Sequence, residues 1–77
     1  MITLKNIEIK GNFIEADFYS DGKEFKGHIR INTETKETES YNLPSEYSET
    51  DLFFAKQGLK KLIGETEVPK EKTIMWY

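Results

Sequence analysis

The chain has 77 residues, of which 11 are basic and 14 acidic, and it contains no cysteine. One domain, residues 1–77, is expected from this length, with a core that leaves only roughly 3–5 kcal/mol of stability. The formal charge of −3 argues against a protein that binds polyanions through its overall charge. The absence of cysteine excludes disulfides and thiolate zinc sites and fits a reducing, cytoplasmic location. Without an apolar run of membrane-spanning length, no membrane association is expected.

The first predicted element is a strand spanning approximately Ile2–Lys10. Its apolar residues fall in two phases, with Ile2 and Leu4 in one and Ile7 and Ile9 in the other. A β-bulge near Lys5-Asn6 would reconcile the phases, and so would a first half that is covered on both sides. The sequence leaves both explanations open. Gly11-Asn12 then predicts a turn that sets Ile9 opposite Ile14.

Two alternating runs flank Asp21-Gly22, which predicts a two-residue type I′ turn and therefore a hairpin. Counting from this turn gives the register of the second and third strands. The face expected in the core pairs Phe18 with Phe25, Ala16 with Gly27 and Ile14 with Ile29. The open face pairs Asp17 with Lys26, Glu15 with His28, Phe13 with Arg30 and Tyr19 with Glu24. Because glycine inside a strand often marks a close approach, a helix or an aromatic ring is expected over Gly27.

A polar segment after Ile31 predicts a fourth strand that ends at Leu43, because Pro44 cannot donate to a β-ladder. The hydrophilic residues 37–40 indicate that this strand lies at an edge of the sheet. The sequence does not determine whether Tyr41 points into the core or away from it.

The helix is expected to begin at Ser48, which together with Asp51 resembles a capping box. Tyr47 and Leu52 occupy the two positions of a hydrophobic staple. The apolar stripe that would pack on the sheet consists of Leu52, Ala55, Leu59, Leu62 and Ile63.

Two glycines mark the second half of this helix. Gly64 is expected at the C′ position that ends it. Gly58 indicates a close contact on the flank that carries Phe54, because glycine is unfavourable inside a helix. Phe53 projects from the opposite flank.

The final apolar run, Thr73–Tyr77, predicts a last strand. Because the helix carries the chain back across the sheet, this strand can lie antiparallel beside the first. The predicted fold class is α+β: a single antiparallel sheet of four meandering strands plus a C-terminal strand, in the order 5-1-2-3-4, with one helix packed on one face. Whether Trp76 completes the core or belongs to an interface is left open.

His28, the only histidine, is expected beside Glu15 on the open face. Such a pair can act in general acid–base catalysis, but no nucleophile, oxyanion device or phosphate-binding loop accompanies it. The carboxylates alternate with Lys10, Lys26 and Arg30, as on an ordinary solvated face, so no metal site is expected. We therefore predict a protein that is not an enzyme and has no cofactor.

The predicted binding residues are aromatic or cationic: Phe13, Tyr19, Lys26, His28, Arg30 and Phe53. Aromatic anchors in a polar surround are typical of interfaces, so an adaptor or inhibitor-like role towards a protein partner is the main interpretation. The alternative is single-stranded nucleic-acid binding, because rings stack bases and cations contact phosphates. A monomer or an edge-strand homodimer fits either role. In size, charge and element order the chain resembles small accessory proteins of bacterial mobile elements and phages.

Overall fold

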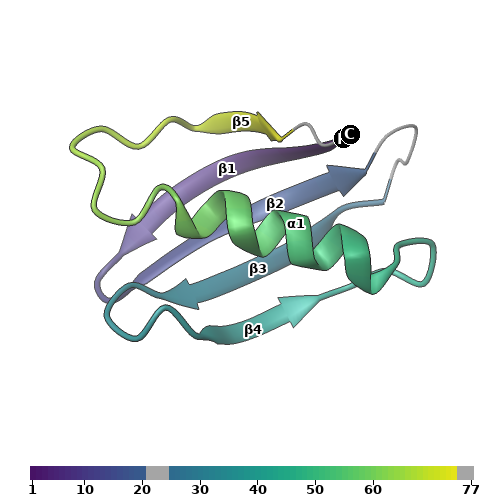
Figure 1. Ribbon diagram of the computed structural model, residues 1–77, viewed down its shortest axis with the longest axis horizontal. Coiled ribbons are helices and arrows are strands. Elements are labelled where there is room, and N and C mark those ends of the chain that lie inside the picture. Colours follow the sequence, from purple (N-terminus) through teal and green to yellow (C-terminus); the bar gives the residue numbers. More distant parts are fainter. Residues whose placement is uncertain (21–24, 75–77) are drawn as a thin grey trace.

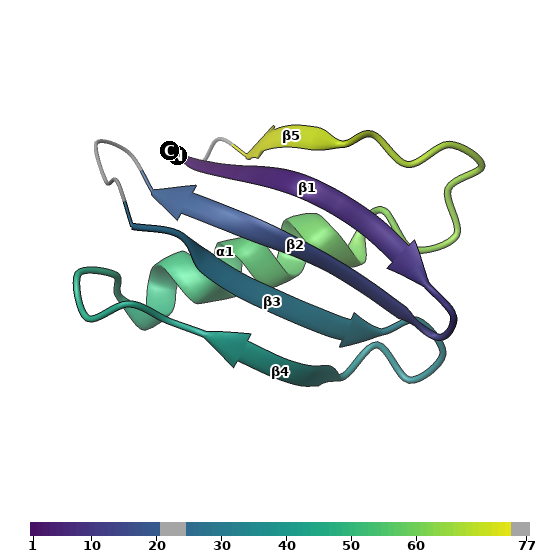
Figure 2. The ribbon, with the colours of Figure 1, turned by 180° about the vertical axis from the view of Figure 1, so that it is seen from behind.

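The computed structural model describes residues 1–20 and 25–74 and contains one antiparallel sheet with a helix across one face (Figure 1). The elements are β1 (Ile2–Lys10), β2 (Phe13–Ser20), β3 (Gly27–Asn32), β4 (Thr38–Asn42), α1 (Glu49–Lys60) and β5 (Glu71–Ile74). The strand order β4-β3-β2-β1-β5 confirms both the α+β class and the order expected from the sequence. Seen from behind, the other face of the sheet has no helix on it (Figure 2), and this is the open face.

The register between β2 and β3 differs by two residues from the predicted one. The observed partners are Phe18 with Gly27, Ala16 with Ile29 and Ile14 with Ile31. Pairing with a glycine leaves room for the Phe18 ring, because a side chain at position 27 would overlap that ring. Phe25 therefore lies outside the sheet and is 59% exposed, so its assignment to the core was wrong.

The register is displaced by two residues, an even number, so the remaining residues of the two strands stay on their predicted faces, because side chains alternate along a strand. The core side of the sheet accordingly contains the residues expected there, including Phe18, Ile14 and Ile29, all fully buried. The Asp21-Gly22 turn and the pairs predicted for Lys23 and Glu24 lie outside the described residues.

A β-bulge in β1 explains the two apolar phases of this strand. The register against β2 shifts between Lys5 and Glu8, and Asn6 has a left-handed φ of 55°. Ile2 and Leu4 before the bulge and Ile7 after it are all buried. Ile9 does pair with Ile14, but it is 48% exposed, because the β1–β2 turn extends beyond the end of α1 (Figure 1). Its expected burial was therefore wrong.

The beginning of α1 follows the prediction. The Ser48 hydroxyl accepts a hydrogen bond from the Asp51 amide at 3.3 Å, and the Asp51 carboxylate accepts one from the Ser48 amide at 2.9 Å. Tyr47 and Leu52, the predicted staple, are both 6% exposed. The buried stripe beneath the helix contains Leu52, Ala55, Leu59 and Leu62, with Ile63 only partly buried.

The helix ends earlier than predicted, at Lys60 rather than next to Gly64. Beyond it the chain tightens into turns in which each amide bonds three residues back, as from Ile63 to Lys60 and from Glu65 to Leu62. Gly64, with φ of 90°, closes these turns instead of the α-helix itself.

Strand β5 lies antiparallel to β1, with Ile74 opposite Ile2. A side chain at Gly58 would overlap the end of Ile74, so this glycine allows α1 to approach β5. The expected close contact at Gly58 is confirmed. Trp76 and the remainder of the predicted last strand lie outside the described residues. Within the described part of the chain, no helix has the length and apolar character needed to cross a membrane.

Candidate functional site

The structure divides the six predicted binding residues between two surfaces. Five of them, Phe13, Tyr19, Lys26, His28 and Arg30, belong to β2 and β3 or to the segment directly before β3, on the open face. Phe53 lies on α1, across the sheet from the others, and is 52% exposed.

The nearest carboxylate to His28 is that of Asp17 and not, as predicted, that of Glu15. Its Nδ1 lies 2.9 Å from Oδ1 of Asp17, whereas its Nε2 lies 3.9 Å from Oε1 of Glu15. The two-residue displacement of β3 causes this change, because it places Asp17 directly opposite His28. Both carboxylates are nearly buried, at 9% and 8% exposure, although they lie on the face without a helix.

Asp17 is held as a carboxylate by its neighbours. Burial by itself disfavours the charged form, but hydrogen bonds from His28 and Asn6 and the charges of Lys26 and His28 lower the pKa of Asp17. The Asn6 amide donates to Asp17 at 2.9 Å, and Lys26 Nζ lies 3.8 Å from the same oxygen. Two of the carboxylate's neighbours thus come from the bulge of β1 and the entry to β3.

Glu15 is surrounded by cations in the same way. Arg30 Nη2 lies 3.5 Å and Lys10 Nζ 3.9 Å from its carboxylate oxygens. Lys10 also lies 3.6 Å from Glu8, which is directly opposite Glu15 in the sheet. A shared cation therefore offsets the repulsion between these two facing carboxylates. The basic side chains Lys10, Lys26 and Arg30 are all paired.

The two aromatic rings of the open face are covered by cations as well. The guanidinium of Arg30 lies 5.3 Å from the Phe13 ring centre, and Lys5 Nζ lies 5.4 Å from that of Tyr19. Such cation–π contacts occupy ring faces that would otherwise be free to stack on a ligand. The open face is thus largely satisfied by interactions within itself.

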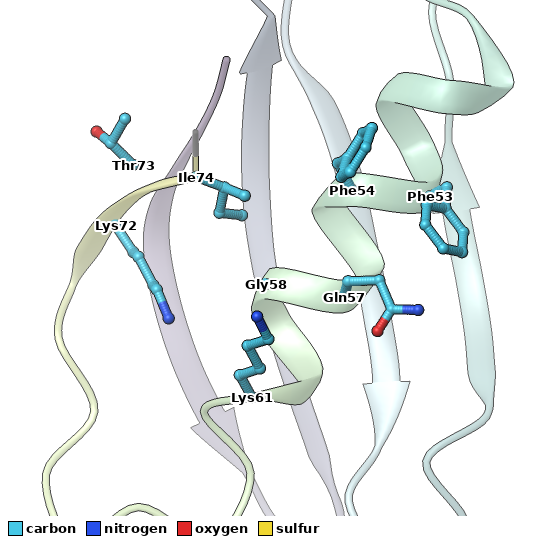
Figure 3. A pocket seen from close by; sticks show the side chains of 8 residues that line it. All are labelled: Phe53, Phe54, Gln57, Gly58, Lys61, Lys72, Thr73 and Ile74. Atoms are coloured by element: carbon cyan, nitrogen blue, oxygen red, sulfur yellow. The ribbon is translucent and has the colours of Figure 1, made fainter. Parts of the chain in front are cut away.

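The second surface is a groove between α1 and β5, with a volume of about 450 Å³ (Figure 3). Its apolar wall consists of Phe53, Phe54 and Ile74. The two phenylalanine rings meet edge to face, with centroids 5.5 Å apart and planes at 76°. Such a contact stabilises this arrangement of the two rings, while about half of Phe53 remains in solvent. We refer to this feature as the α1–β5 groove.

Two lysines line the α1–β5 groove, Lys61 at the C-terminal end of α1 and Lys72 on β5 (Figure 3). Neither forms an ion pair with any residue in the ranges 1–20 and 25–74. They differ in this respect from Lys10, Lys26 and Arg30 on the open face. The groove therefore combines apolar surface with positive charge that no ion pair among the described residues neutralises.

Sequence analysis identified Phe53 but missed the groove beside it. The groove exists because β5 lies next to α1, a relationship that depends on the fold and not on local pattern. Gly58 was the one available signal, since a helix that lacks a side chain there can approach a neighbouring strand closely. Lys61 gave no such signal, because a cation at the end of a helix is already explained by its favourable interaction with the helix dipole.

Comparisons with protein-family models, with curated proteins and with solved structures find no match to this chain. No three metal-ligating side chains come together in the part of the chain that the structure describes. The function is therefore inferred from the geometry of the two surfaces alone.

Proposed function

We propose that this protein is a non-catalytic, cytoplasmic binding module that recognises a protein partner through the α1–β5 groove. The observation that carries the proposal is the position of Phe53, half exposed and held edge to face against Phe54 at the wall of the groove. A rigid, partly exposed ring beside a hollow is the arrangement that interfaces use as an anchor, because little side-chain freedom remains to be lost on binding.

The open face gives less support to the alternative, single-stranded nucleic-acid binding. Binding to a nucleic acid requires cations that are free to neutralise its phosphates. Lys10, Lys26 and Arg30 already face nearly buried carboxylates. Stacking of bases requires free ring faces, and those of Phe13 and Tyr19 have cations over them. Each contact with a nucleic acid would therefore replace an existing one.

Catalysis receives still less support from the pair formed by His28 and Asp17. An aspartate beside a histidine can orient a general base, but that base needs a nucleophile or a substrate proton within reach. Among the described residues, no hydroxyl group hydrogen-bonds to His28. We propose instead that this pair stabilises the sheet across β2 and β3.

The proposal is tested by capture from a bacterial lysate with the tagged domain and two matched variants. Phe53→Ser removes the groove anchor, and Phe25→Ser removes a phenylalanine of similar exposure that does not line the groove. We expect a protein band that survives nuclease treatment, is lost with Phe53→Ser and persists with Phe25→Ser.

Two results would contradict the proposal. Capture that disappears with nuclease would favour the nucleic-acid alternative, and Phe13→Ala and Tyr19→Ala would then be the informative variants. Capture that is insensitive to Phe53→Ser would place the binding surface elsewhere. Circular dichroism of each variant checks that the fold is retained.

A further inference from the structure

We infer that the α1–β5 groove accepts an acidic peptide segment with an apolar side chain, whose carboxylates contact Lys61 and Lys72. The inference rests on the proposed function and specifies the chemistry of the partner. The apolar side chain would lie against Phe53 and Ile74, and the carboxylates would flank it at the two lysines.

The charge distribution of the protein indicates an acidic ligand. The chain is acidic overall, with a formal charge of −3, and three cations of its open face, Lys10, Lys26 and Arg30, are paired with carboxylates. Lys61 directly follows α1 and Lys72 belongs to β5, yet they line the same groove, and neither forms an ion pair with a residue in the described ranges. An acidic ligand would supply the charge that is missing there.

The shape and polarity of the groove carry the next step. A volume of about 450 Å³ is within the range of roughly 300–1,000 Å³ that is typical of ligand sites. The absence of a side chain at Gly58 allows α1 to lie close to Ile74 of β5, and Phe53, Phe54 and Ile74 line the same groove. A ligand with only charge would leave this surface exposed to water, whereas a ligand with only apolar groups would leave the lysines unpaired.

The exposure and spread of the lining residues indicate which kind of ligand the groove accepts. Phe53 lines the groove and is 52% exposed, so a ligand can reach the groove from the surface. The lining residues are spread along the groove: Phe53 lies on α1, Lys61 directly follows it and Lys72 lies on β5. This spread suits an extended peptide with alternating anchor and acidic side chains better than a single small anion.

The test is a titration of the full ¹⁵N-labelled chain, followed by NMR, with three capped synthetic hexapeptides. The acidic probe is Glu-Asp-Leu-Phe-Asp-Glu, the neutral probe replaces its acids by Gln and Asn, and the basic probe replaces them by Lys. We expect the acidic probe to shift the amides of Phe53, Lys61 and Thr73, with a Kd at least tenfold below that of the neutral probe. Binding should weaken as salt is added, because ionic strength screens exposed charges.

A pair of neighbouring lysines provides the matched control. Lys72→Gln, within the groove, should weaken the acidic probe at least fivefold, whereas Lys70→Gln, which changes the net charge equally but does not line the groove, should leave its Kd unchanged. Equal effects of the two substitutions would show that only overall charge matters and would overturn the inference.

The other outcomes separate this inference from the proposed function. If the neutral probe binds as tightly as the acidic one, or if no probe binds, the acidic chemistry is wrong, while loss of lysate capture by Phe53→Ser would still support the groove. Shifts confined to the open face would overturn the inference.

Discussion

The side-chain amide of Asn6 donates a hydrogen bond of 2.9 Å to Oδ2 of Asp17. Asn6 is the bulged residue of β1, and its left-handed φ of 55° turns its side chain towards the open face. The same bulge lets Ile7 return to the core after Leu4. One residue thus reconciles the two apolar phases of β1 and supplies a donor to a carboxylate that is almost buried.

Replacement of Asn6 by alanine should lower the free energy of unfolding by about 2 kcal/mol, because it removes this hydrogen bond and places a less tolerant residue at positive φ. Asn6→Gly keeps the backbone conformation and should lower it by only about 1 kcal/mol. Urea denaturation at neutral pH measures both values. A larger loss for glycine than for alanine would contradict this account of the bulge.

The lowered pKa of Asp17 makes a prediction about stability in acid. A carboxylate whose pKa is lower in the folded state stabilises the fold above its unfolded pKa, about 3.9, and this contribution is lost as the pH falls through the folded pKa. Asp17→Asn should therefore be less stable than the natural chain at pH 7, and the difference should shrink below pH 4, where both side chains become neutral.

Urea denaturation from pH 2 to pH 7 measures this dependence. Glu8→Gln is the matched control, because it removes the same charge from a carboxylate whose side chain is 58% exposed. This substitution should change the pH dependence little, since exposed ion pairs contribute only about 0–1 kcal/mol. If the stability gap between Asp17→Asn and the natural chain stayed constant with pH, the carboxylate would not be the cause.

Gly27→Ala should destabilise the protein by about 1–3 kcal/mol through overpacking. A methyl group at Gly27 would lie within 2.6 and 2.7 Å of the Cε atoms of the Phe18 ring, which is fully buried and has no free space to enter. The substitution should be less harmful in a Phe18→Leu background. Thermal unfolding of the two single variants and the double variant measures this coupling, and strict additivity would argue against the ring contact.

Gly58→Ala should also be destabilising, by about 1 kcal/mol, although alanine at an ordinary helix position would stabilise by a similar amount. A methyl group there would overlap the end of Ile74, so β5 would have to move away from α1. In an Ile74→Ala background the same substitution should become neutral or stabilising. Chemical denaturation of the two single variants and the double variant provides the measurement. Stabilisation by Gly58→Ala alone would contradict the contact with Ile74.

The faces of the strands were predictable from the sequence because alternation fixes them locally. Phe18, Ile14 and Ile29 lie in the core as expected, and the order of the strands followed from the direction in which the helix returns the chain. The capping box at Ser48 was equally local, since its two hydrogen bonds join residues three positions apart.

The register of the hairpin was not predictable from its turn alone. Asp21-Gly22 was read as a two-residue loop, but β2 ends at Ser20 and β3 begins only at Gly27. The Phe18 ring decides the register, because it needs a glycine beside it. This is a contact between strands and not a property of the turn, and it also changes the partner of His28 from Glu15 to Asp17.

The candidate site was predicted only in part, for a similar reason. Phe53 was recognised as exposed because its position on the helix is a local property. Lys72 could not be placed beside it, because nothing in the sequence gives the distance between a helix and a strand that follows it after ten residues. The pairing of the open-face cations was expected as a general pattern, whereas their individual partners depend on the register.

The pairing of β1 with β5 has a consequence for synthesis on the ribosome. Ile2 is synthesised long before its partner Ile74, so one edge of β1 stays unpaired while β2, β3, β4 and α1 assemble. During this interval the contact between Gly58 of α1 and Ile74 of β5 is missing. Folding of the nascent chain is therefore expected to be completed in a single late step, when β5 docks.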